Sequence, residues 1–113
     1  MSDGDLVYFM IPVKDGGKGK TFYGSLFGWD FTAGTVPGGF NIEGPNPPGG
    51  LFGGGPGDRP QVWFGVADLE AALEKVRGLG GHASPPEEIQ SGFMASCIDD
   101  QGTKFNLWAP KEK

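Results

Sequence analysis

The sequence is poor in cysteine and histidine. Among its 113 residues, Cys97 is the only cysteine and His82 the only histidine. A single cysteine excludes an internal disulfide framework. A lone histidine is more often structural or solvated than catalytic, so the sequence leaves the roles of His82 and Cys97 open.

Long apolar runs and an excess of basic residues are also missing. No apolar run approaches the roughly 18 residues that a transmembrane helix needs, and the start, MSDGDL, lacks the basic segment of a signal peptide. The net charge of −5 argues against a nucleic-acid partner, because neutralising phosphates requires a basic face. We therefore expect a cytoplasmic protein that binds neither a membrane nor nucleic acid.

Glycine and proline, in contrast, are abundant. The 22 glycines and 10 prolines make up 32 of the 113 residues, a share that on its own is typical of disorder. However, the chain also has three tryptophans and nine phenylalanines, and its glycines and prolines fall mostly between apolar runs. They therefore predict turns in a strand-rich fold, and the length suits a single domain.

The stretch 61–81, QVWFGVADLEAALEKVRGLGG, predicts a strand followed by a helix. Residues 61–67 alternate between apolar and other side chains, as in a strand with one buried face. Asp68 occupies the position of a helix N-cap. Apolar residues then recur at spacings of three and four until Gly80 and Gly81, which predict the end of the helix.

The first half of the chain has a similar plan, displaced by 53 residues. Identical residues recur at this offset in seven pairs: Val13/Val66, Asp15/Asp68, Gly28/Gly81, Gly39/Gly92, Phe40/Phe93, Gly49/Gly102 and Phe52/Phe105. An ungapped series of this kind predicts an internal duplication. We expect one domain, residues 1–113, made of module one (about 6–54) and module two (about 61–110), with a linker at about 53–60.

Each module is expected to have the order β-α-β-β-β, which makes the fold class α+β. In module one we predict strands at 7–14, 29–35, 39–43 and 50–53, a turn at 15–20 and a helix at 21–27. In module two we predict strands at 61–67, 82–84, 93–98 and 103–108 around the helix after Asp68. The segments 85–91 and 99–102 are predicted to be turns.

This doubled unit resembles the vicinal oxygen chelate superfamily, which contains glyoxalases, bleomycin resistance proteins and extradiol dioxygenases. The resemblance spans about residues 6–110 and rests on FMIPVKD…KTFYGSLFGWDF, VWFGVADLEAALEKVRGLGG and IDDQGTKFNLW. It is strongest with small glyoxalase-like members without an assigned reaction. It implies that the modules form a curved mixed sheet, with helices on one side and a concave ligand pocket on the other.

The alternation along the strands then assigns side chains to the two sides. The helix side receives Val7, Phe9, Ile11, Val13, Val62, Phe64, Val66, Phe105 and Leu107. The pocket side receives Tyr8, Met10, Pro12, Gln61, Trp63, Gly65, Lys104, Asn106 and Trp108. Aromatic, amide and cationic groups together are typical of a small-molecule pocket, although Trp63 and Trp108 could instead fill a second core or a dimer interface.

Enzymes of the superfamily bind a divalent metal at four positions, usually through histidine or glutamate. The resemblance places these positions at Tyr8, Gly53, Gln61 and Asn106. A phenol, two amides and a glycine provide no anionic or imidazole ligand, so we expect no metal and no cofactor.

The sequence therefore predicts metal-independent binding of a small aromatic or amphipathic molecule, with Tyr8, Met10, Gln61, Trp63, Lys104, Asn106 and Trp108 in contact. The resemblance also implies a homodimer. Two alternatives stay open. The first is an enzyme, either a metal-dependent lyase, isomerase or dioxygenase or a metal-free proton-transfer enzyme. The second is a module that docks a protein through its aromatic face. A turn of four residues at 99–102 would place Cys97 opposite Lys104 on the pocket side, where the lysine would favour the thiolate.

Overall fold

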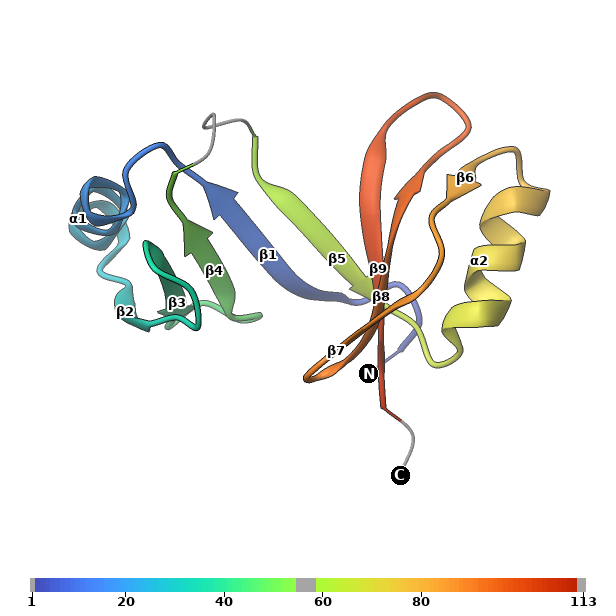
Figure 1. Ribbon diagram of the computed structural model, residues 1–113, viewed down its shortest axis with the longest axis horizontal. Coiled ribbons are helices and arrows are strands. Elements are labelled where there is room, and N and C mark those ends of the chain that lie inside the picture. Colours follow the sequence, from blue (N-terminus) through green and yellow to red (C-terminus); the bar gives the residue numbers. More distant parts are fainter. Residues whose placement is uncertain (1, 55–58, 112–113) are drawn as a thin grey trace. The chain divides into compact units, whose positions relative to one another are not determined.

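The computed structural model of the chain describes residues 2–54 and 59–111. It contains two compact units (Figure 1). One consists of Tyr8–Gln61, and the other of Val62–Lys113 together with Met1–Val7. Residues 55–58 of the linker expected at about 53–60 lie outside the described residues. Module one and module two denote the two halves expected from the sequence, about 6–54 and 61–110.

Module one has the predicted order of elements: β1 (Leu6–Pro12), α1 (Gly16–Phe27), β2 (Asp30–Ala33), β3 (Gly39–Glu43) and β4 (Gly49–Phe52). The strands lie in the order β2-β3-β4-β1. β2/β3 and β3/β4 are antiparallel, whereas β1 and β4 are parallel. Each observed strand begins or ends within two residues of its predicted bounds.

The helix of module one begins earlier than predicted, because residues 15–20 are not a turn. Asp15 caps α1 by accepting a hydrogen bond from the Lys18 backbone N–H at 3.1 Å. Gly16 and Gly19 are both buried in α1. A Cβ at Gly16 would occupy the space of the Gly38 carbonyl oxygen. The glycines that suggested a turn therefore allow the helix to approach the sheet closely.

Module two has one strand more than predicted. It consists of β5 (Gln61–Gly65), α2 (Leu69–Gly78), β6 (His82–Ala83), β7 (Glu87–Ile89), β8 (Gly92–Ile98) and β9 (Lys104–Pro110). β5 lies parallel to β9, β9 is followed by β8 and β6, and β7 also pairs with β8. The predicted turn at 85–91 is therefore wrong for 87–89, where Ile89 pairs with Gly92 to close a tight hairpin.

The first residues of the chain belong to module two, although the sequence suggested only a polar lead before module one. The Gly4 N–H donates to the Gly65 carbonyl at 2.9 Å, and the Gly65 N–H donates to the Asp5 carbonyl at 2.8 Å. The Asp3 carboxylate accepts from the Ala67 N–H at 2.9 Å. Backbone hydrogen bonds at the end of β5 thus fix this segment.

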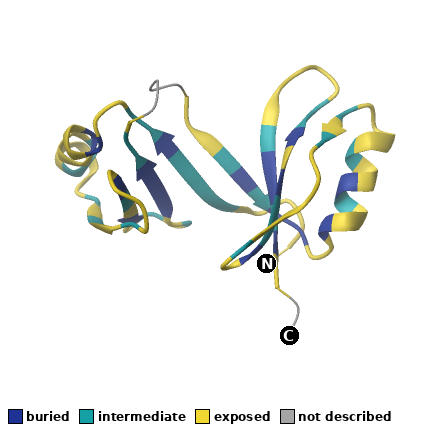
Figure 2. Ribbon diagram, viewed as in Figure 1, coloured by how far each residue is buried: buried dark blue, intermediate teal, exposed yellow. Residues whose placement is uncertain are grey.

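Each module has its own apolar core between helix and sheet (Figure 2). The core of module one contains Phe9, Ile11, Val13, Tyr23, Trp29, Phe31, Phe40, Ile42 and Leu51. The core of module two contains Phe64, Val66, Leu69, Leu73, Ala95, Cys97, Phe105, Leu107 and Ala109. The predicted helix side is confirmed for seven of its nine residues, while Val7 and Val62 are half-buried.

Strand pairing shows that the offset of 53 does not continue through the later strands. Met10 and Trp63 are 53 residues apart, and their strand partners are Gly50 and Asn106, which are 56 apart. Backbone hydrogen bonds show the same shift. The Val13 N–H donates to the Phe52 carbonyl and the Val66 N–H to the Trp108 carbonyl, so donors at the offset of 53 have acceptors at the offset of 56. The β7–β8 hairpin of module two changes the spacing, so the identical pairs from Gly39/Gly92 onward are not equivalent positions.

Two βαβββ-type modules make the fold α+β, as predicted. In the described part of the chain, neither helix has the length and apolarity to cross a membrane.

Candidate functional site

Module two presents a set of aromatic and polar side chains on the side of its sheet that faces away from α2. Cross-strand partners share a side of the sheet, and Asn106 pairs with both Trp63 and Ser96. Trp108 pairs with Met94, and Lys104 with Ile98, which also pairs with His82. We call this set the module-two face: Trp63, His82, Met94, Ser96, Ile98, Lys104, Asn106 and Trp108.

The centre of the module-two face is buried and its polar group is bonded. Asn106 is 6% exposed and Trp63 is 9% exposed. The Asn106 side-chain N–H donates to the Val62 carbonyl at 3.1 Å. This hydrogen bond offsets the cost of burying the amide and fixes its orientation.

Trp108 is half-buried and is held by a residue that the sequence did not single out. Its indole N–H donates to the Ser91 hydroxyl at 3.1 Å. Ser91 lies in the turn between β7 and β8, so the hairpin absent from the predicted fold positions this ring. An exposed ion pair between Lys111 and Glu88, 3.2 Å long, joins the same hairpin to the end of β9, and such pairs contribute little to stability.

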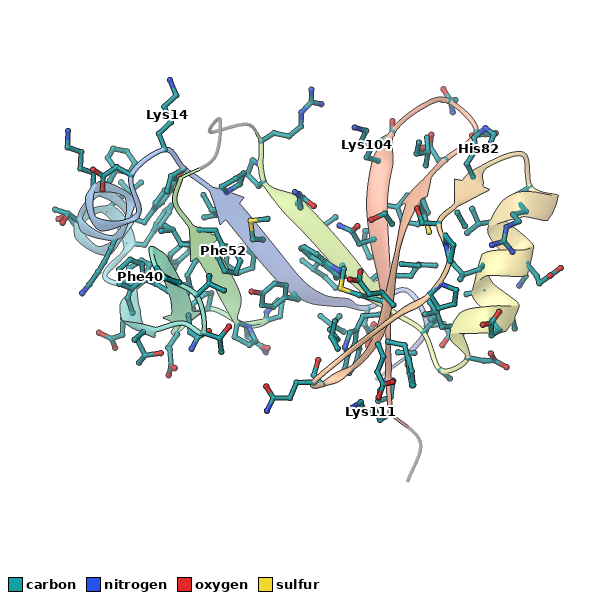
Figure 3. The ribbon with its side chains drawn as sticks, viewed as in Figure 1. Lys14, Phe40, Phe52, His82, Lys104 and Lys111 are labelled. Atoms are coloured by element: carbon teal, nitrogen blue, oxygen red, sulfur yellow. The ribbon has the colours of Figure 1, made fainter. Side chains whose placement is uncertain are left out.

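The rim of the module-two face is polar. Lys104 and His82 are both exposed, at the β9 and β6 positions on either side of Ile98 (Figure 3). The lysine places a positive charge two residues along β9 from the buried Asn106. A bound molecule that carries an anionic group would therefore be favoured at this end.

Module one has a corresponding face on the side of its sheet away from α1. Met10 pairs with Gly50 and Pro12 with Phe52, while Leu51 between them packs in the core. The Tyr8 hydroxyl lies where a Cβ on Gly50 would project. Burial raises the pKa of Tyr8, so the phenol stays protonated and can donate a hydrogen bond.

Phe52 is a second functional candidate that the sequence analysis missed. Strand pairing makes it the counterpart of Trp108, and Figure 3 shows it on the side of β4 away from α1, whereas Phe40 lies toward α1. Its ring lies over Gly39, where a Cβ would approach it to 2.9 Å. The period-two pattern of residues 49–52 could have placed Phe52 beside Met10 and Pro12.

Six of the seven predicted contact residues thus occupy two surfaces. Four are on the module-two face: Trp63, Lys104, Asn106 and Trp108. Tyr8 and Met10 are on the module-one face, and Gln61 is the exposed first residue of β5.

The predicted metal positions need one correction. The counterpart of Asn106 is Gly50 and not Gly53, because Met10 and Trp63 pair with these two residues. A side chain at Gly53 would collide with the backbone of Gly16. The revised set still offers a phenol, two amides and a glycine, which does not fit a divalent catalytic metal. Within the described residues, no three His, Cys, Asp or Glu side chains form a metal-binding group.

Cys97 does not face Lys104, which corrects the expectation from the sequence. It pairs with Phe105 and lies in the core beneath α2, because the hairpin register joins Ile98 to Lys104. The loop is one residue longer than assumed. Burial raises the pKa of the Cys97 thiol, and the positive charge of Arg77 opposes this only in part. A buried, protonated thiol is a poor nucleophile.

Comparisons with known proteins support a common family. The family described as "Bleomycin resistance protein-like N-terminal" matches residues 5–38. CFP32 of Mycobacterium bovis and of Mycobacterium tuberculosis, which carries a provisional glyoxylase name, is 30% identical over 116 residues. That alignment covers 87% of this chain and 42% of CFP32, so the chain spans about two fifths of these relatives' length.

Solved structures share the fold across nearly the whole chain. Methylmalonyl-CoA epimerase from Mycobacterium tuberculosis superposes with a TM-score of 0.75 at 15% identity, covering 99% of this chain and 92% of the epimerase. The hypothetical protein BH1468 from Bacillus halodurans gives 0.77 at 14% identity, with coverages of 97% and 96%. A glyoxalase/bleomycin resistance protein/dioxygenase superfamily member from Vibrio splendidus gives 0.67 at 14%, with coverages of 93% and 98%. The chain thus shares the fold of a glyoxalase/bleomycin resistance protein/dioxygenase superfamily member, and its residues 5–38 match the bleomycin resistance protein-like family.

Proposed function

We propose that the module-two face binds a small molecule that has a planar apolar part and an anionic or hydrogen-bonding end, and that it does so without a metal. The observation that carries this proposal is the register of β5, β9 and β8. It places two tryptophans and a methionine on one side of the sheet with a buried, oriented amide and an exposed lysine.

The order of these residues along β9 suggests how a ligand would lie. From Lys104 through Asn106 to Trp108 is four residues, or about 13 Å at about 3.3 Å per residue. The rings of Trp63 and Trp108 and the thioether of Met94 would contact the apolar part. Asn106 and Ser96 would form hydrogen bonds, and Lys104 would attract a negative charge.

Binding by these groups needs no Lewis acid. Apolar contact supplies affinity, and a few fixed polar groups supply orientation, as in most small-molecule sites. The structure of methylmalonyl-CoA epimerase from Streptomyces coelicolor in complex with 2-nitronate-propionyl-CoA shows that the fold can hold a small molecule. That protein is 15% identical to this chain, so the similarity supports the binding of a small molecule but not a shared reaction.

The module-one face, with Tyr8, Met10 and Phe52, is proposed as a second apolar surface. We also propose that the assembled form is a homodimer.

The three tryptophans provide a direct test. Trp29 lies in the core of module one, whereas Trp63 and Trp108 are on the module-two face. We expect 2-naphthoate to shift the indole N–H resonances of Trp63 and Trp108 in an NMR titration and to leave that of Trp29 in place. Assignment uses single Trp→Phe variants. A shift confined to Trp29, or no shift, contradicts the proposed surface.

Two further measurements address charge and metal. Lys104→Gln should weaken 2-naphthoate binding about two- to fivefold, the scale of one exposed ion pair, and leave neutral 2-naphthol unaffected. Binding should be the same before and after treatment with EDTA. Loss of binding in EDTA and its recovery with Zn²⁺, Ni²⁺ or Fe²⁺ would instead support the metal-dependent enzyme.

A further inference from the structure

The helix of module one exposes three large apolar side chains at the edge of the module-one core. Phe22 is 61% exposed, Leu26 59% and Phe27 55%. Figure 2 shows α1 exposed along most of its length, with Gly16 and Gly19 as its buried residues. Exposed apolar groups gathered on one element are typical of an interaction surface. We call Phe22, Leu26 and Phe27 the α1 patch.

The duplicated helix shows that the fold does not require this patch. The offset of 53 holds for the helices, because Asp15 and Asp68 cap them in the same way, each accepting from the residue three positions on. At the positions of Phe22, Leu26 and Phe27, module two has Lys75, Leu79 and Gly80. Position 75 in α2 therefore tolerates a charge, and positions 79 and 80 lie beyond the end of α2, so exposed aromatic rings at these positions are not a requirement of the fold.

Neighbouring rings hold the α1 patch in place. The Phe22 and Tyr23 ring centroids are 5.1 Å apart with an edge-on arrangement, and those of Phe27 and Trp29 are 4.6 Å apart. Rings that are already ordered lose little side-chain entropy on association. Preordered aromatic residues are common binding hot spots.

We infer that the α1 patch binds the α1 patch of a second copy of this chain, with the two helices antiparallel. This inference specifies the interface of the homodimer in the proposed function. A two-fold symmetric contact would place Phe22 of one copy near Leu26 of the other, one helical turn along. The small buried residues stay on the sheet side, and the side chains that project from α1 would interdigitate.

The charges of α1 fit an antiparallel pair. The helix has no acidic residue in its first turn and no basic residue in its last turn. Lys18 lies in the first turn, where its charge opposes the positive end of its own helix dipole. In the antiparallel pair, Lys18 would lie near the C-terminal end of the partner helix, which carries negative partial charge and is followed by Asp30. Self-association thus converts an unfavourable charge into a favourable one.

Two other quantities set the expected strength. Each copy carries a net charge of −5, but this repulsion is screened beyond about 8 Å at physiological salt. Two helices of 12 residues bury less than the about 1,600 Å² of a standard interface, so a weak, reversible dimer is expected.

Sedimentation velocity between about 1 µM and about 1 mM, a range that brackets weak association, tests the inference. We expect the wild-type chain to shift from monomer to dimer. Leu26→Lys should weaken the dimer at least tenfold, whereas Leu79→Lys, the same change at the exposed counterpart that follows α2, should have no effect. Lys18→Glu should also weaken the dimer, in a salt-dependent manner, and Lys14→Glu should not.

The outcomes separate this inference from the proposed ligand site. A wild-type chain that stays monomeric, or a dimer that Leu26→Lys leaves intact or that Leu79→Lys disrupts equally, overturns the α1 interface. Circular dichroism confirms that each variant is folded. The monomeric Leu26→Lys variant should still show the 2-naphthoate shifts of Trp63 and Trp108, so failure of dimerisation and failure of ligand binding are read independently.

Discussion

The two modules attach the same helix to the same kind of sheet by different means. In module two, α2 packs through Leu69 and Leu73, which are 6% and 0% exposed. In module one, α1 is buried only at Gly16 and Gly19. α2 thus packs through buried leucine side chains, whereas α1 places two buried glycines against its module and adds Tyr23 as a partly buried side chain.

This difference extends to the opposite faces of the sheets. Module two has Asn106 and Trp108 in its last strand, and module one has Gly50 and Phe52 at the equivalent positions. In module one, the Tyr8 hydroxyl occupies the space where a side chain at Gly50 would lie. In module two, the side chain of Asn106 itself occupies the equivalent space. A duplicated fold thus keeps its strand pairing while each copy distributes volume differently between helix, sheet and site.

The largest expected effect tests whether α2 depends on filled volume. Leu73→Ala should lower the free energy of unfolding by about 3 kcal/mol, because it removes a fully buried side chain and leaves a cavity. The exposed Leu26→Ala in α1 should change it by less than about 0.5 kcal/mol. Chemical denaturation measures both. Similar losses for the two variants would show that α1 is held by its exposed residues after all.

The next effect concerns Gly50 and the ring above it. Gly50→Ala should destabilise the protein by about 1–3 kcal/mol, since the new methyl group competes with the Tyr8 hydroxyl for one space. Tyr8→Phe removes that hydroxyl and should recover much of the loss. A double-mutant cycle over these positions is expected to show a clear coupling energy. If the two changes are simply additive, the Tyr8 ring does not occupy this position.

A pair of glycine substitutions should have opposite signs in the two helices. Gly16→Ala should destabilise, because a Cβ there meets the Gly38 carbonyl oxygen. Gly78→Ala should stabilise by about 0.5–1 kcal/mol, because nothing lies within 4 Å and alanine favours the helix. Thermal unfolding measures the stability of both variants. A gain in stability from Gly16→Ala would refute the close approach of α1 to the Gly38 carbonyl.

Local patterns in the sequence were sufficient for most of the framework. The cap at Asp68, the stripe after it and the alternation of 61–67 each depend on residues close in the chain, so they specify β5 and α2 directly. The same alternation placed Trp63, Asn106 and Trp108 on one side of the sheet. That side is fixed by a period of two once a strand is recognised.

The predictions that were wrong share one cause. In each case the local structure depends on contacts between residues that are distant in the sequence. Gly16 and Gly19 suggest a turn on their own, and the close approach to Gly38 and the sheet explains why they are helical. The β7 strand exists because it pairs with β8, and Ser91 gains its role from Trp108. Cys97 lies on the other side of the sheet than expected because the following hairpin is one residue longer than assumed, and a one-residue change of register moves a side chain to the opposite face.

The smallest expected effect distinguishes the last hairpins of the two modules by their response to acid. The Asp99 carboxylate accepts hydrogen bonds from the Gln101 and Thr103 N–H groups at 2.8 and 2.9 Å. Bonds from Thr103 and then Gln101 lower the pKa of Asp99 below its usual 3.8. The carboxylate therefore supports the turn above that usual value and loses this role as the pH falls through the lowered pKa.

The turn at 44–48 of module one, GPNPP, contains no carboxylate and should not respond in this way. Hydrogen exchange followed by NMR should show that protection of the Gln101 and Thr103 amides falls in acid, while that of β3 and β4 amides persists. Asp99→Asn should remove the pH dependence at Gln101 and Thr103. An equal acid response in both hairpins would mean that the modules unfold together, and that the difference between them does not extend to the local stability of their turns.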